Sequence, residues 1–246
     1  MTKACVLFQG DSITDCGRAA CGGAGFDSKG LGPGYPGMIA ARLACDRPGV
    51  EWDFINRGIS GNRVVDLYAR WKIDALNLKP DFLSILIGVN DTWHEFGSAN
   101  GVEVPRYERI YRELIEWAQR ELPELKLILL EPFVLCFGAV SEPWLPEISE
   151  RARIVRALAA EYGALFIPLQ DLFSEAAKKA SIPPPPDISL SRMHGSVPFL
   201  PSCPGTREKE EKLLCFIRCL FLMETRLHGR LPQARFASLK AGMTEK

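Results

Sequence analysis

The sequence predicts an α/β fold in which a central sheet of five parallel strands lies between two layers of helices. Five short apolar segments alternate with helical patterns along the first 180 residues. This alternation requires crossover connections, which are right-handed and place helices on both faces of a parallel sheet. At 246 residues, the chain is long enough for one such domain to bury a sizeable core.

The expected strands are apolar runs of strand length, and the expected helices are longer segments with helical periodicity. The strands are predicted at Ala4–Phe8, Trp52–Ile55, Phe82–Ile87, Leu125–Leu130 and Ala164–Ile167. The helices are predicted at Tyr35–Cys45, Val64–Leu76, Arg106–Leu122 and Glu147–Tyr162. In the last helix, Ile148, Val155 and Leu158 recur at the spacing of one helical face.

Composition excludes several classes of protein. Thirty basic residues balance thirty acidic ones, so no strong overall field attracts nucleic acid. The N-terminal apolar run is too short for a signal peptide, and no segment approaches the roughly 18 apolar residues of a membrane span. The eight cysteines form no Cys-x-x-Cys pair, and there are only three histidines. We therefore expect no metal site, a cytoplasmic location, and core positions for Cys5 and Cys136.

Three polar motifs follow the first three predicted strands. They are Gly10-Asp11-Ser12-Ile13-Thr14, Gly58-Ile59-Ser60-Gly61-Asn62 and Gly88-Val89-Asn90-Asp91. Because the carboxyl ends of parallel strands share one edge of the sheet, these motifs are expected to converge there. A serine at the exit of a buried strand is well placed to act as a nucleophile. The alternatives are an ordinary turn or helix cap at each motif.

Together the motifs resemble the SGNH (GDSL) hydrolases, a family of serine esterases and lipases. Further segments resemble a bacterial branch that includes carbohydrate acetylesterases and lysophospholipase-like enzymes. Those segments are Asn56–Val64, Leu67–Trp71, Pro80–Trp93 and Glu131–Phe133. The resemblance covers roughly residues 3 to 180. The resemblance therefore implies a flavodoxin-like three-layer α/β/α fold. It also implies that the protein hydrolyses small acyl esters, without a cofactor, through an acyl-Ser12 intermediate.

The resemblance also implies the site residues. Ser12 is the expected nucleophile, and the oxyanion hole is expected from the backbone amides of Ser12 and Gly61 and the side chain of Asn90. A glycine lets the backbone approach a substrate closely, and an asparagine amide supplies a neutral N–H donor.

The family's catalytic base is a histidine three residues after an aspartate, usually followed by proline. His194 lies at about the right place, but Ser191 occupies the aspartate position and Gly195 replaces the proline. Three interpretations stay open. His194 acts as the base with Asp187 or water orienting it, or His194 is a surface residue in a replaced C-terminal part. Otherwise another histidine, His94 or His228, serves as the base.

The family pattern ends abruptly after about residue 180, so we expect a hydrolase core at 1–180 and an atypical segment at 181–246. A four-proline break at 183–186 opens this segment, which is predicted to contain a covering helix at about 206–225 and a loose tail. A shifted reading frame is one hypothesis for the change. The competing function is a catalytically impaired binding or structural module, because the Asp-x-x-His element is not intact.

Overall fold

The computed structural model describes residues 2–18, 30–136 and 138–180. Its strands are β1 (Thr2–Gly10), β2 (Val50–Asn56), β3 (Phe82–Leu86), β4 (Lys126–Leu130) and β5 (Leu165–Ile167). Its helices are α1 (Ser12–Asp15), α2 (Tyr35–Asp46), α3 (Val64–Asp74), α4 (Val89–Ser98), α5 (Val104–Glu121), α6 (Leu145–Glu161) and α7 (Gln170–Ala180). Short 3-10 turns occupy Leu76–Leu78 (η3) and Glu142–Trp144 (η4). All five predicted strands and all four predicted helices are confirmed, with ends that differ by a few residues.

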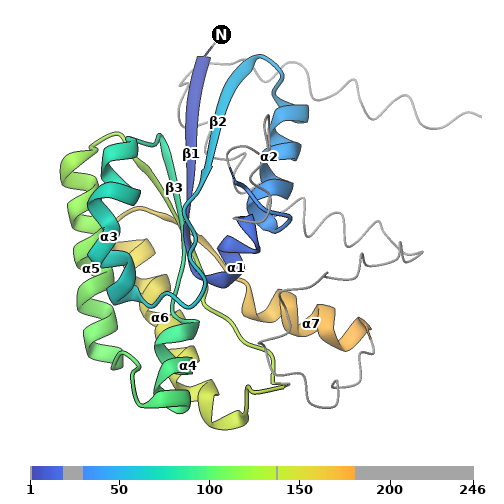
Figure 1. Ribbon diagram of the computed structural model, residues 1–246, viewed down its shortest axis with the longest axis vertical. Coiled ribbons are helices and arrows are strands. Elements are labelled where there is room, and N and C mark those ends of the chain that lie inside the picture. Colours follow the sequence, from blue (N-terminus) through green and yellow to red (C-terminus); the bar gives the residue numbers. More distant parts are fainter. Residues whose placement is uncertain (1, 19–29, 137, 181–246) are drawn as a thin grey trace, which may run out of the picture. The chain divides into compact units, whose positions relative to one another are not determined.

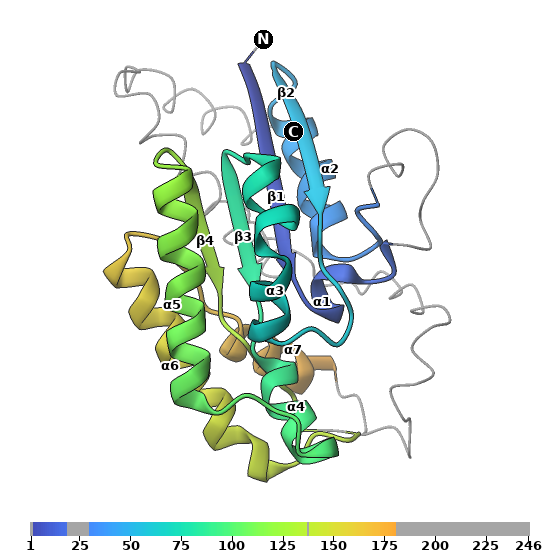
Figure 2. The same cartoon turned by 60° about the vertical axis from the view of Figure 1, so that its left-hand side comes forward.

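The strands form one parallel sheet in the order β2-β1-β3-β4-β5 (Figures 1 and 2). β1 lies between β2 and β3, so that Val6 pairs with Phe54 on one side and with Phe82 on the other. This is the flavodoxin-like strand order, and it confirms the predicted three-layer α/β/α fold. The order places the ends of β1, β2 and β3, which precede the three motifs, side by side.

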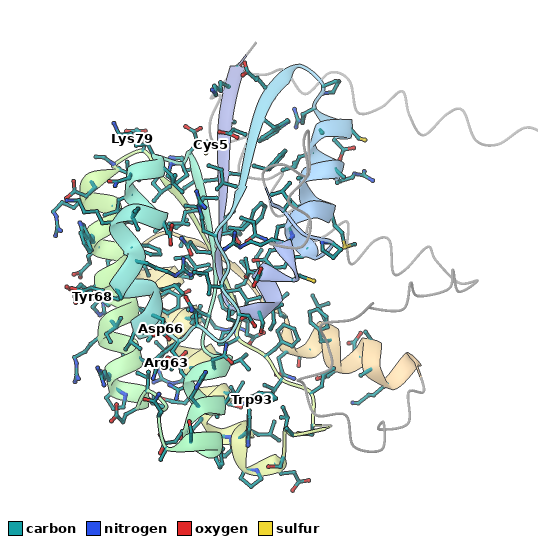
Figure 3. The ribbon with its side chains drawn as sticks, in the orientation of Figure 1. Cys5, Arg63, Asp66, Tyr68, Lys79 and Trp93 are labelled. Carbon is teal, nitrogen blue, oxygen red and sulfur yellow. The ribbon has the colours of Figure 1, made fainter. Side chains whose placement is uncertain are left out.

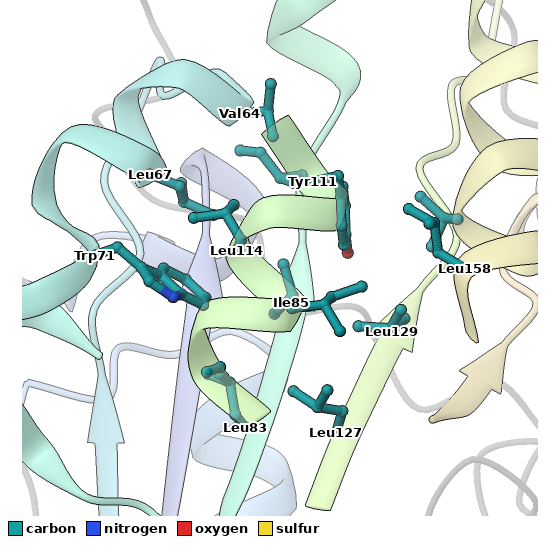
Figure 4. Packing of buried hydrophobic residues seen from close by; sticks show 14 of the residues in the cluster. Val64, Leu67, Trp71, Leu83, Ile85, Tyr111, Leu114, Leu127, Leu129 and Leu158 are labelled. Carbon is teal, nitrogen blue, oxygen red and sulfur yellow. The ribbon is translucent and has the colours of Figure 1, made fainter. Parts of the chain in front are cut away.

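Alternate residues of the strands contribute to two hydrophobic layers. Leu7, Ile85 and Leu129 belong to a buried cluster that also contains side chains of α3, α5 and α6 (Figure 4). Phe8 points to the opposite face, where its ring meets Tyr35 of α2 edge-on at a centroid separation of 5.8 Å. Both faces of the central strands are thus covered, as a parallel sheet requires.

Three helices were not predicted: α1, α4 and α7. In α4, the residues that face the interior include Asn90, Asp91 and Thr92, all of which are buried. Buried polar side chains interrupt the apolar periodicity from which a helix is recognised in a sequence. The expectation of a core position for Cys136 is wrong, because this residue is exposed in the connection after β4.

No helix within residues 2–18, 30–136 and 138–180 has both the length and the apolar character needed to cross a bilayer. The atypical segment at 181–246, with its predicted covering helix, lies outside the described residues.

Candidate active site

Ser12 is the first residue of α1 and directly follows the turn that ends β1. The Asp11 side chain caps this helix by accepting a hydrogen bond from the Ile13 backbone N–H at 2.9 Å. Gly10 is required by close packing, since a Cβ there would lie 2.2 Å from Thr14 Oγ1 and 2.4 Å from the Leu86 carbonyl oxygen. Ser12 is exposed at the carboxyl end of the sheet.

Asn56, the last residue of β2, joins the segments after β1 and β2. Its Nδ2 donates to the carbonyl oxygens of Thr14 at 2.7 Å and Leu31 at 2.9 Å, and its Oδ1 accepts from the Gly58 N–H at 2.8 Å. Asn56 is only 1% exposed. Its amide therefore fixes the position of α1 relative to the glycine-containing loop that follows β2. The sequence placed Asn56 inside the resembling segment but did not indicate this role.

Replacing Asn56 by alanine is expected to lower the free energy of unfolding by about 2–3 kcal/mol, measured by urea denaturation. The substitution leaves two carbonyl oxygens and one N–H without their hydrogen-bond partner. Because the site is buried, water does not readily take the place of the lost amide. Asn77→Ala in η3 is the matched control, because Asn77 is exposed, and it should change stability by less than about 0.5 kcal/mol. A loss at Asn56 no larger than in this control would contradict the assigned role.

The loops after β2 and β3 are hydrogen-bonded to each other. Asn90 in α4 is buried, and its Nδ2 donates to the Asn62 carbonyl oxygen at 3.0 Å. His94, one turn further along α4, lies with Nε2 3.0 Å from the Gly61 carbonyl oxygen. Gly61 has a φ of 81°, a left-handed conformation that favours glycine. The structure therefore brings together Gly61 and Asn90, the two residues expected to form the oxyanion hole with the Ser12 amide.

Arg63 adds a further connection, between the start of α3 and the segment that follows α4. Its guanidinium donates to the carbonyl oxygen of Asn100, beyond the end of α4, at 2.7 Å and to the side-chain oxygen of that residue at 3.0 Å. It also pairs with Asp66 at 2.9 Å within α3. Figure 3 shows Arg63 and Asp66 near the start of α3, with Trp93 of α4 in the same lower part of the molecule. These contacts hold the start of α3 to the end of α4.

Two aspartates of the motifs, Asp11 in the first and Asp91 in the third, have buried carboxyl groups. Burial raises the pKa of Asp11 to about 7; the hydrogen bond from Ile13 opposes the rise, and the nearby charge of Asp91 adds to it. Burial likewise raises the pKa of Asp91 to about 7, against a backbone hydrogen bond from Val64 and the charge of Arg151. Within the described ranges, Asp11 Oδ2 has no hydrogen-bond partner. Both carboxyl groups therefore resist ionisation more than ordinary aspartates do.

His194, the predicted catalytic base, lies outside the part of the chain that the structure describes. Asp187 and His228 lie outside it as well, so only His94 of the three histidines has a described position. In the described ranges, no group of three or more His, Cys, Asp or Glu side chains is arranged to hold a metal ion.

Residues 8–188 match the family model described as the GDSL-like Lipase/Acylhydrolase family. The chain belongs to this family. It is 36% identical over 197 residues to an acetylxylan esterase from Geobacillus stearothermophilus, a match covering 78% of this chain and 86% of that protein. The GDSL membership and this relative place the chain among ester hydrolases.

Solved structures of GDSL proteins also resemble it. A GDSL-like lipase from Parabacteroides merdae matches with a TM-score of 0.67 at 39% identity, covering 73% of this chain and 83% of that one. A variant of the G. stearothermophilus acetylxylan esterase Axe2 matches with a TM-score of 0.63 at 36% identity, covering 71% and 80%. Variants of Axe2 with alanine in place of a serine, an aspartate or a histidine are described as catalytic mutants.

Proposed function

We propose that this GDSL protein hydrolyses short acyl esters, with acetyl groups on carbohydrates as the leading substrate class, through a covalent intermediate on Ser12. The observation that carries the proposal is the arrangement at the carboxyl edge of the sheet. The exposed Ser12 follows β1, and the mutually bonded Gly61 and Asn90 segments follow the strands on either side of it, β2 and β3. The identity to an acetylxylan esterase supports the choice of acyl group and alcohol.

In the first step, Ser12 Oγ forms a bond to the acyl carbon while its proton passes to the base. The carbonyl oxygen becomes an oxyanion, for which we assign the N–H groups of Ser12 and Gly61 and the side chain of Asn90 as donors. Asn90 Nδ2 carries two hydrogens; one is donated to the Asn62 carbonyl, and we assign the second to the oxyanion. Each such donor typically contributes about 2.7–4 kcal/mol to transition-state stabilisation.

In the steps that follow, the bond between the acyl carbon and the alcohol oxygen breaks, and the alcohol leaves with the proton from the base. Water then attacks the acyl-Ser12 ester and gives a proton to the same base. The bond between the acyl carbon and Ser12 Oγ breaks, the base returns the proton to Oγ, and the carboxylic acid leaves. We assign the base to His194. Axe2 supports a histidine in this role, because its histidine-to-alanine variant is described as a catalytic mutant.

One feature favours a second candidate, a catalytically impaired binding or structural module. Ser191 stands three residues before His194, where the family has an aspartate, and an aspartate variant of Axe2 is also described as a catalytic mutant. Without that carboxylate, the imidazole lacks the group that orients it and stabilises its protonated form. The two candidates differ in whether Ser12 reacts.

Labelling with a fluorophosphonate probe separates the two candidates. The wild-type chain is expected to gain the mass of one probe less HF, because fluoride leaves as Ser12 Oγ bonds to phosphorus, with the modified peptide containing Ser12. It is also expected to hydrolyse p-nitrophenyl acetate and acetylated xylo-oligosaccharides. Comparison with a lysophospholipid tests the substrate class. A folded chain that neither takes up the probe nor hydrolyses any of these esters would overturn the proposal and favour the binding module.

A further inference from the structure

His94, which is not one of the expected site residues, contacts the loop after β2 that contains Gly61. Asn90 and His94 are four residues apart in α4 and therefore lie on the same face of the helix. The two side chains contact consecutive carbonyl groups of the loop after β2: His94 contacts that of Gly61, and Asn90 that of Asn62. One turn of helix thus holds two successive peptide groups next to the assigned oxyanion donor.

The chemistry of this contact determines whether Nε2 of His94 donates or accepts the hydrogen bond. A carbonyl oxygen can only accept a hydrogen bond, so Nε2 of His94 must carry a proton and donate it. The same nitrogen is therefore not available to accept the proton of Ser12. His94 is partly buried, so its bond to the loop is shielded in part from competing water.

Gly61 is a suitable target for such support because of its backbone conformation. Its φ of 81° lies in the left-handed region, and a Cβ added there would meet no atom within 4 Å. Glycine is the residue with the most conformational freedom. The turn that contains Gly61 is closed by the Asn62 N–H, which donates to the Ile59 carbonyl oxygen at 3.1 Å, and the contact from His94 adds a second restraint. A hydrogen bond to its carbonyl oxygen restricts rotation about the residue and with it the direction of its N–H.

We propose that His94 is a positioning residue for the oxyanion hole, acting through the Gly61 carbonyl, and not the catalytic base. The inference rests on the proposed function for the role of the Gly61 N–H. The loop keeps its other anchors when His94 is changed, since Asn90 binds the Asn62 carbonyl and Arg63 binds Asn100. Variants at His94 are therefore expected to fold.

Two substitutions test the proposal. His94→Leu removes the donor, and His94→Gln places an amide N–H near the position of Nε2. For p-nitrophenyl acetate, His94→Leu is expected to lower kcat roughly 5- to 10-fold with little change in KM, the range of one lost hydrogen bond. His94→Gln is expected to stay within about 3-fold of wild type. The rate of fluorophosphonate labelling should fall in parallel with kcat, because that reaction also places a charged oxygen in the hole.

Ser98→Ala is the control on the same helix, since Ser98 is exposed and its hydroxyl donates to the backbone carbonyl oxygen of His94, not to the loop after β2. It should match wild type in both assays. Equal losses in His94→Leu and His94→Gln would overturn the proposal, because they would show that ring shape and not the donor matters. An unchanged kcat in His94→Leu would overturn it as well.

An NMR measurement separates failure of this inference from failure of the proposed function. The Asn62 amide shares a peptide group with the Gly61 carbonyl, so its ¹⁵N shift should move in His94→Leu and return in His94→Gln. A wild-type chain without Ser12-dependent hydrolysis would overturn the proposed function and, with it, the positioning role of His94. An active wild type whose Asn62 amide does not respond to His94→Leu would overturn the inference alone.

Discussion

Replacing Ser12 by alanine is expected to lower kcat for p-nitrophenyl acetate by about four orders of magnitude or more. Alanine removes the only atom that forms the acyl bond, so the covalent route is closed, and the activity that remains comes from oxyanion stabilisation and binding. The side chain is exposed, and the helix cap from Asp11 to Ile13 does not involve it. The melting temperature should therefore stay close to that of wild type.

The measurement is the steady-state rate per mole of folded protein, with circular dichroism and melting temperature recorded for each variant. Ser149→Ala is the matched control, because Ser149 is an exposed serine of α6 outside the motif-bearing loops, and its kcat should equal that of wild type. Retention of more than a tenth of the wild-type kcat in Ser12→Ala would contradict a Ser12 nucleophile, even though the chain belongs to an esterase family.

Replacing Asp11 by asparagine is expected to remove much of the pH dependence of stability between about pH 4 and 7. Burial raises the pKa of Asp11 from 3.8 to about 7 in the folded state. The folded chain therefore binds this proton throughout a window in which the unfolded chain has lost it. Stability from this group is fully present below pH 3.8 and is lost as the pH rises toward 7. The integrated loss is on the order of 4 kcal/mol.

Urea denaturation at several pH values measures this effect as the slope of unfolding free energy against pH. The amide oxygen introduced by Asp11→Asn would still accept from the Ile13 N–H, so the helix cap survives in this variant while the ionisation is gone. Part of the slope should remain, because burial also raises the pKa of Asp91 to about 7. Glu51→Gln, at an exposed carboxylate on β2, should leave the slope unchanged. An Asp11→Asn slope equal to that of wild type would refute a raised pKa at this position.

Much of the fold could be predicted from the sequence because its signals are local. The strands carry short apolar segments, and α2, α3, α5 and α6 carry apolar residues at helical spacing, so element type follows from neighbouring residues alone. The alternation of strands and helices then requires a parallel sheet with its motifs at one edge. The resemblance of the three motifs to the SGNH hydrolases implied Ser12, Gly61 and Asn90, and the structure joins the segments of the latter two through the Asn62 carbonyl.

The sequence by itself thus determined the fold class, the order of the elements and the residue types at the edge of the sheet. Only the tertiary structure decided that β1 lies between β2 and β3, that Asn56 joins two loops, and that His94 reaches the Gly61 carbonyl. The physical reason is that these hydrogen bonds join residues 25 to 42 positions apart. Their geometry depends on how whole elements pack, and no local periodicity encodes that packing.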